Sequence, residues 1–212
     1  AEAQRRFQER DTHLCRYNEY DEVVLWFEHD LYDQLQLLQL LDWFARADLS
    51  QARLTLVQSD YFLGMTPAKA YSELLLQRKP VTAGQFDLAQ RAWAAFRQPA
   101  PQAWRALLDA DTAPLPYLSS IVRRHLEQFP APVSGLNRTE RQIMQAVAAG
   151  ATNAGEIFHK AEALEEARFM GDWTVWLYLN RMLESDPPLL RAPGRPGFRI
   201  DPQNKGLEQY QV

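Results

Sequence analysis

The fold is decided by one stretch, Val23-Val24-Leu25-Trp26-Phe27-Glu28-His29-Asp30-Leu31-Tyr32-Asp33-Gln34. Its apolar run ends abruptly in Glu28-His29-Asp30, and a leucine-rich pattern with helical spacing follows at once. A short apolar run that is rich in β-branched and aromatic residues is typical of a buried strand. The stretch therefore predicts a strand that delivers three polar side chains to a strand-to-helix turn.

The segments that follow predict a parallel βαβ unit. A helix is expected from residue 31 to about residue 46, because its apolar residues recur at helical spacing, and a second strand is expected over residues 53–58. Short joins between strand, helix and strand favour a right-handed parallel crossover. Since two strands alone do not make a stable parallel sheet, we expect further strands from a segment that precedes residue 1 or from another copy in a homo-oligomer.

The remainder of the chain predicts helices and a second domain. The Pro-rich segment at residues 130–135 is typical of a boundary, so we expect an α/β and helical domain over 1–134, a second domain over 135–200 and a tail over 201–212. Three helical patterns followed by a strand-turn-strand pattern at residues 189–200 indicate a winged-helix-like domain. The predicted fold class is α+β, predominantly helical, with a small parallel βαβ layer under helical cover and a C-terminal winged-helix-like domain.

Composition limits the partners of the protein. A hydrophobic content of 46% predicts a packed core, and a net charge of −4 argues against bulk binding to nucleic-acid phosphates. The charge is uneven, because residues 1–60 hold twelve acids and six bases whereas residues 61–135 hold five acids and eight bases. The lone Cys15 cannot form an internal disulfide, so we expect a cytoplasmic location and a packing role for this residue. The sequence has no apolar run of ~18–20 residues, and we expect no membrane partner.

The acidic turn is the first candidate site. Ligands of open α/β sheets bind at the carboxyl ends of strands, and the carboxylates of Glu28, Asp30 and Asp33 crowd this position without a glycine. The pattern therefore favours a divalent metal, a cationic group or a metal-bridged phosphate over direct phosphate binding. The candidate catalytic residues are Glu28, His29, Asp30 and His125, with His29 or His125 as the acid or base and Glu28, Asp30 and Asp33 as metal ligands. The alternative is structural: Asp30 caps the helix, Asp33 complements its dipole, and Glu28 pairs with an arginine.

The predicted winged-helix-like domain invites a nucleic-acid interpretation that its residues disfavour. The third helical pattern, residues 172–184, has Arg181 as its only base and an acid, Asp172, at its start. Recognition helices usually present basic and amide groups to phosphates and base edges. We therefore expect structural or protein-contact use of this domain. The candidates for nucleic-acid contact are Arg191, Arg195 and Arg199.

Six stretches resemble the bacterial domain-of-unknown-function 1835 family over nearly the full length of the chain. They are YDEVVLWFEHDLYDQ (residues 20–34), RKPVT (78–82), AWAAF (92–96), RHLEQFP (124–130), GLNRTE (135–140) and FMGDW (169–173). The resemblance implies an additional N-terminal α/β segment before residue 1. It implies no activity, cofactor or catalytic residue.

These observations leave three function classes. The first is a binding or regulatory module with protein or small-molecule contacts at the seam of the two domains. The second is a metal-assisted enzyme that acts on a phosphate-containing substrate at the Glu28-His29-Asp30 turn. The third is a winged-helix regulator that binds nucleic acid. A divalent metal is the only cofactor that the sequence suggests, and it belongs to the second class.

Overall fold

The structure is a computed structural model that describes residues 2–192 of the 212. The chain divides into two compact units, residues 1–123 and residues 124–212. The division falls within helix α6 (Leu118–Leu126), whereas the Pro-rich segment that predicts a boundary lies further along, inside the second unit. The described residues confirm the predicted class, a predominantly helical α+β fold.

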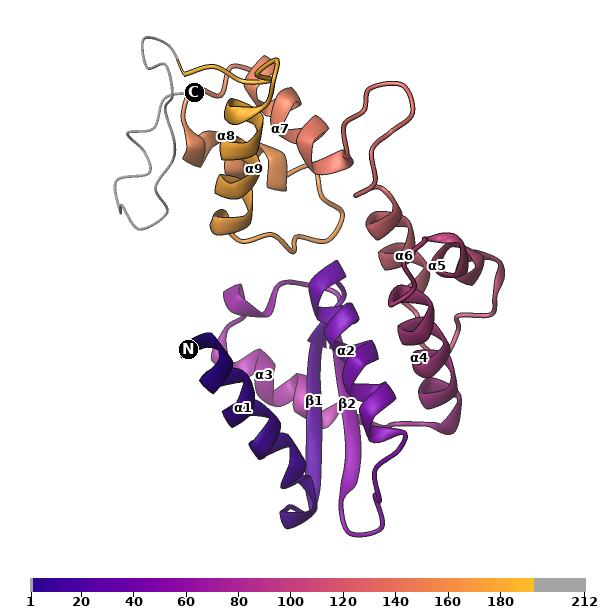
Figure 1. The fold of residues 1–212 in the computed structure, drawn as a ribbon. Helices are drawn as coiled ribbons and strands as arrows, with labels where there is room; N and C mark the ends of the chain where they lie inside the picture. The colour runs from indigo at the N-terminus through magenta and orange to yellow at the C-terminus, as the bar shows by residue number, and fades with distance from the viewer. Residues whose placement is uncertain (1, 193–212) are drawn as a thin grey trace. The chain divides into compact units, whose positions relative to one another are not determined.

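The βαβ unit forms as the sequence predicts. Strand β1 (Glu22–Glu28) leads into helix α2 (Leu31–Phe44), and strand β2 (Arg53–Ser59) follows. The two strands pair in parallel from Glu22↔Arg53 to Glu28↔Ser59 (Figure 1). Both strands therefore point their carboxyl ends at the same edge of the sheet.

The third strand comes from an unexpected place. Strand β3 (Lys79–Pro80) pairs antiparallel with β2, which gives the order β1-β2-β3. The sequence pattern predicted no strand at this position, and further strands were expected from a preceding segment or another copy. That expectation is wrong for β3, because this strand is supplied by the chain itself. The strand has only two residues, one of them a proline without an N–H, which explains why no strand pattern marks it.

Helix α2 organises the first unit. It packs on β1 and along helix α4 (Ala83–Phe96), so it is covered on more than one side. The side chains of Leu37, Leu41 and Phe44 are at most 1% exposed. The other helices of this unit are α1 (Glu2–Cys15), α3 (Ala68–Leu76) and α5 (Gln102–Ala106), with 3-10 turns at Tyr17–Glu19, Leu63–Met65 and Leu107–Asp109.

Helix α1 has no buried residue, unlike helices α2, α3, α4 and α5. The predicted packing role of Cys15 is wrong, since this residue is exposed at the end of α1. A cavity of about 670 Å³ lies between α1 and α2. Its apolar lining includes Leu14, Leu40 and Trp43.

The second unit contains helices α7 (Arg138–Ala148), α8 (Ala154–Glu162) and α9 (Asp172–Glu184) around one core. Ile143, Ile157 and Leu179 are fully buried in this core. No strand forms between residues 185 and 192, and the second arm of the predicted hairpin lies outside the described residues. The winged-helix-like interpretation stays a prediction. Between residues 2 and 192, the helices are too short or too polar to span a membrane.

Candidate functional site

The acidic turn at the end of β1 is built around a helix cap. Asp30 is the N-cap residue of α2, and its Oδ1 accepts hydrogen bonds from the N–H groups of Tyr32 at 2.8 Å and Asp33 at 3.1 Å. The side chain is only 5% exposed. Burial, together with the nearby carboxylates of Asp33 and Glu28, raises the pKa of Asp30 to about 6. The capping interpretation of Asp30 is confirmed.

The carboxylate of Glu28 is also used within the fold. Its Oε1 accepts a hydrogen bond at 2.9 Å from the main-chain N–H of Leu63. The predicted arginine partner is wrong, because no arginine among residues 2–192 forms an ion pair with Glu28, and Arg53 and Arg78 pair with Glu22 at the other end of β1. Arg78 Nε lies 2.8 Å from Glu22 Oε1, and this hydrogen bond is the main cause that lowers the pKa of Glu22 to about 2. Burial raises the pKa of Glu28.

Asp33 and Gln34 of α2 bond to the main-chain groups of Glu28 at the end of β1. The N–H of Glu28 donates to Asp33 Oδ2 at 2.7 Å, and Gln34 Nε2 donates to the C=O of Glu28 at 2.6 Å. Both main-chain groups of Glu28 point away from β2. They face the side of β1 on which a further strand could pair. Two side chains of α2 therefore take the place of a strand at this residue.

The remainder of this edge is open. Arg53 N–H donates to the C=O of Asp21, which sets the phase of the parallel ladder. Odd-numbered residues of β1 consequently bond to β2, and even-numbered residues point their main-chain groups outward. Within residues 2–192, no hydrogen bond joins the main-chain N–H or C=O of Val24 or Trp26 to another residue. We call these four groups the free edge of β1.

The candidate metal ligands are close in sequence but not arranged for a metal. In the part of the chain that the structure describes, no three His, Cys, Asp or Glu side chains are grouped to hold an ion. The carboxylates of Glu28, Asp30 and Asp33 each accept a main-chain N–H instead. Such contacts hold the three carboxylates in the turn, each on its own main-chain donor and not around a common point.

The two candidate histidines lie in different units. His29 Nδ1 is buried without a hydrogen-bond partner among residues 2–192, and its ring packs 5.7 Å from that of Tyr117. Burial, and secondarily the charge of Asp60, raises the pKa of Tyr117. His125 lies on α6 in the second unit beside Phe129, and burial lowers its pKa.

The candidate nucleic-acid residues are only partly described. Arg191 is exposed just beyond the last buried leucine of the second unit. Arg195 and Arg199 lie outside the described residues. The nucleic-acid interpretation of these three arginines therefore stays a prediction.

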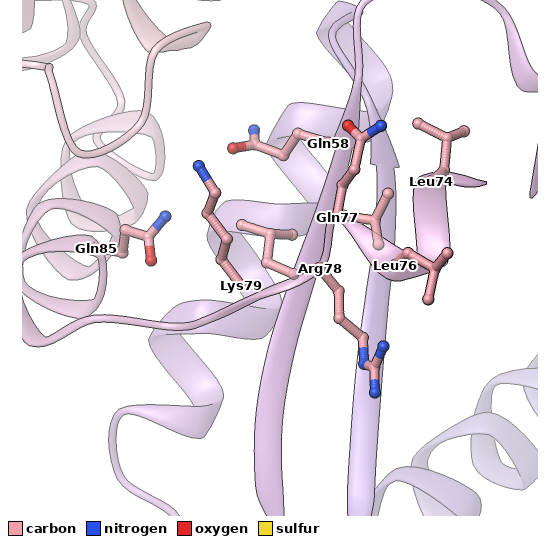
Figure 2. Close-up of a pocket in the computed structure, with 9 residues that line it drawn as sticks. Gln58, Leu74, Leu76, Gln77, Arg78, Lys79 and Gln85 are labelled. Carbon is pink, nitrogen blue, oxygen red and sulfur yellow. The ribbon is translucent and has the colours of Figure 1, made fainter. Parts of the chain in front are cut away.

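A second candidate site lies where β3 stops and β2 continues, and the sequence pattern did not predict it. The pairing with β3 covers Thr55 and Leu56, so the last residues of β2 run beside a cavity of about 610 Å³ (Figure 2). The cavity is lined by Leu56, Val57, Gln58, Leu74, Leu76, Gln77, Arg78, Lys79 and Gln85. The one sequence signal that bears on it is the excess of bases over acids in residues 61–135.

Comparison with known proteins adds no assignment to either site. No protein-family model, curated protein or solved structure matches this chain.

Proposed function

We propose that the chain is a binding module that recruits an extended polypeptide segment to the free edge of β1. The observation that carries this proposal is the set of outward main-chain groups at Val24 and Trp26, which lack partners among the described residues. An exposed edge of this kind is a template for a further strand, and strand addition is a recurring mode of peptide recognition.

The burial of the two long strands supports the same function. Only Leu25 is buried in β1, whereas five of the seven residues of β2 are buried. The side chains of β1 are nevertheless apolar from Val23 to Phe27. A strand of this composition normally has neighbours on both sides, so a partner strand would remove further apolar surface from water.

Helix α1 offers cover for an added strand. Figure 1 places α1 and β2 on opposite sides of β1. The cavity between α1 and α2 is lined by apolar residues that include Leu14, Leu40 and Trp43 and by the polar residues Arg10, Asp11, Gln36 and Gln39. An added strand at the free edge would lie on the side of β1 where α1 is found.

The geometry favours binding over metal-assisted catalysis. The acids of the turn accept main-chain hydrogen bonds. The enzyme interpretation needs Asp30 and Asp33, but Asp30 stabilises the start of α2 and Asp33 stabilises the end of β1. The resemblance to the domain-of-unknown-function 1835 family stays a proposal and supplies no activity.

A matched pair of substitutions at Val24 tests the function. The N–H of Val24 points outward, so Val24→Pro removes a free donor without removing a hydrogen bond to β2, and proline is tolerated at such edge positions. Val24→Ala trims the same side chain and keeps the N–H. The probe is a short peptide of alternating valine and threonine, which favour an extended strand, with a lysine at each end to keep the peptide soluble.

The expected result is saturable peptide binding by the wild-type chain and by Val24→Ala, measured by calorimetry, with amide protection at Val24 and Trp26. Val24→Pro should lose the binding while Leu25 keeps its slow amide exchange. Equal binding by Val24→Pro, or no binding by the wild-type chain at millimolar peptide, would overturn the proposal.

A further inference from the structure

The cavity at the end of β3 is separate from the free edge of β1 and has its own chemistry. Its lining combines two basic residues, three glutamines and four aliphatic residues, and it includes no acid. The protein as a whole carries a net charge of −4, so a cavity without acids is not the average surface of this chain. A volume of about 610 Å³ lies within the usual range of small-molecule sites, roughly 300–1,000 Å³.

Lys79 is the charge that a ligand would meet. Arg78 is already engaged, because its guanidinium donates to Glu22 and to the C=O of Leu75. Figure 2 shows the guanidinium of Arg78 pointing away from Lys79 and Gln58. Within residues 2–192, the ammonium group of Lys79 forms no ion pair. One uncompensated positive charge therefore remains at this cavity.

Two glutamines add hydrogen-bonding groups beside Lys79. Gln85 Oε1 accepts from the N–H of Thr82 at 2.9 Å in the capping box of α4, which leaves its amide N–H groups available. Gln58 contacts Gln34 through its Nε2 at 3.3 Å. Figure 2 shows Lys79 and Gln58 pointing toward one another, with Gln85 facing them from α4. The ammonium and the amides thus form a polar end of the cavity.

Aliphatic side chains form the other part of the lining. Leu74 is 8% exposed, whereas Leu76 is 82% exposed, the most exposed of the leucines on this cavity. A ligand with an apolar body would cover part of Leu76 and remove it from water.

We propose that this cavity binds a small organic monocarboxylate, with its carboxylate on Lys79 and the side-chain amides and its apolar body against Leu74 and Leu76. A single carboxylate matches the single uncompensated ammonium group, and the charged hydrogen bonds that it accepts are stronger than neutral ones. A dianionic phosphate would leave one charge without a partner in this cavity. This proposal is independent of strand addition at β1.

Hexanoate is the probe, and its neutral isostere hexanamide is the control ligand. We expect hexanoate to shift the side-chain amide NMR signals of Gln58, Gln77 and Gln85, and hexanamide to leave them unchanged. Lys79→Gln should weaken hexanoate binding by about tenfold or more, the effect of losing one charged hydrogen bond of ~1.5 kcal/mol. Lys69→Gln makes the same charge change on the outer surface of α3, outside the cavity lining, and should leave the affinity unchanged.

Further variants separate the two halves of the site and the two proposals. Leu76→Ser should weaken hexanoate binding more than acetate binding, because only the longer ligand reaches the aliphatic residues. Val24→Pro should bind hexanoate with the affinity of the wild-type chain, because Val24 is not part of the cavity. Hexanoate binding is therefore tested independently of peptide binding at β1. Equal binding of hexanoate and hexanamide, an unchanged affinity of Lys79→Gln, or no shifts at the three glutamines would overturn the proposal.

Discussion

Asp33 accepts a hydrogen bond at 2.7 Å from the main-chain N–H of Glu28, and it thereby occupies the place of a strand at the edge of the sheet. The adjacent Gln34 completes this arrangement by donating to the C=O of Glu28. Natural proteins commonly blunt sheet edges to prevent unwanted pairing. In this protein the edge is closed at Glu28 and open at Val24 and Trp26, so a partner strand would have a restricted register.

Gln34 should be important for stability because its amide satisfies a main-chain carbonyl group in a site where the side chain is only 3% exposed. Gln34→Leu should lower the free energy of unfolding by about 1–3 kcal/mol, the cost of a buried polar group without a partner. Gln36→Leu, on the exposed side of α2, should change it by less than about 0.5 kcal/mol. Urea denaturation of both variants measures the difference, and equal effects would contradict the role assigned to Gln34.

Asp30 should make stability depend on pH in an unusual direction. Its pKa is raised from 3.8 to about 6 in the folded chain, so the native carboxyl keeps a proton that the unfolded chain has already lost. This contribution to stability is fully present below pH 3.8 and disappears as the pH rises through about 6. Asp30→Asn retains a good N-cap but cannot titrate.

The comparison of wild type with Asp30→Asn isolates this carboxyl. The stability of the wild-type chain relative to Asp30→Asn should fall as the pH increases from about 4 to 6. Thermal unfolding at a series of pH values measures the relative stability. A relative stability that rises over this interval would show that the Asp30 carboxyl is stabilised in its charged form.

The second unit contains a buried ion pair whose disruption should be costly. Arg124 Nη2 lies 2.6 Å from Glu165 Oε1, and the two side chains are 9% and 1% exposed. Glu165→Gln should destabilise the chain by about 3–5 kcal/mol, because the guanidinium is left buried without its countercharge. Glu166→Gln is the matched control. The Glu166 side chain is 79% exposed and pairs with Arg138, so loss of this ion pair should lower the free energy of unfolding by at most about 1 kcal/mol. Similar melting temperatures for the two variants would contradict the assignment.

Two leucines test the packing of the first unit. Leu37 in α2 is 0% exposed. Leu37→Ala should lower the free energy of unfolding by about 2–5 kcal/mol, because apolar burial is lost and a cavity remains. Leu76 is 82% exposed, and Leu76→Ala should change stability by less than about 0.5 kcal/mol in the absence of a ligand. Chemical denaturation distinguishes the two, and a small effect at Leu37 would be inconsistent with the described core.

The local features of the first unit follow from the sequence, and the tertiary ones do not. The apolar run of β1, the helix that starts at Leu31 and the cap at Asp30 are each encoded within a few residues, so periodicity and capping chemistry predict them. The partner of Glu28 is the N–H of Leu63, which lies 35 residues away. No spacing rule identifies such a contact.

The missed strand and the cavity have the same physical origin. β3 exists because the chain after α3 passes the open side of β2, and only two of its residues pair there. The cavity then forms where this pairing stops and side chains from β2, α3 and α4 converge. Both features depend on how distant segments meet, which composition and periodicity do not specify.

Strand β1 has one paired and one free edge, and residue-resolved amide hydrogen exchange of the monomeric chain distinguishes the two. Slow exchange is predicted at Val23, Leu25 and Phe27, whose N–H groups face β2, and faster exchange at Val24 and Trp26. Glu28 should return to slow exchange because its N–H bonds to Asp33. Uniformly slow exchange from Val23 to Phe27 in the monomer would show that the edge is already covered and that β1 has no free edge.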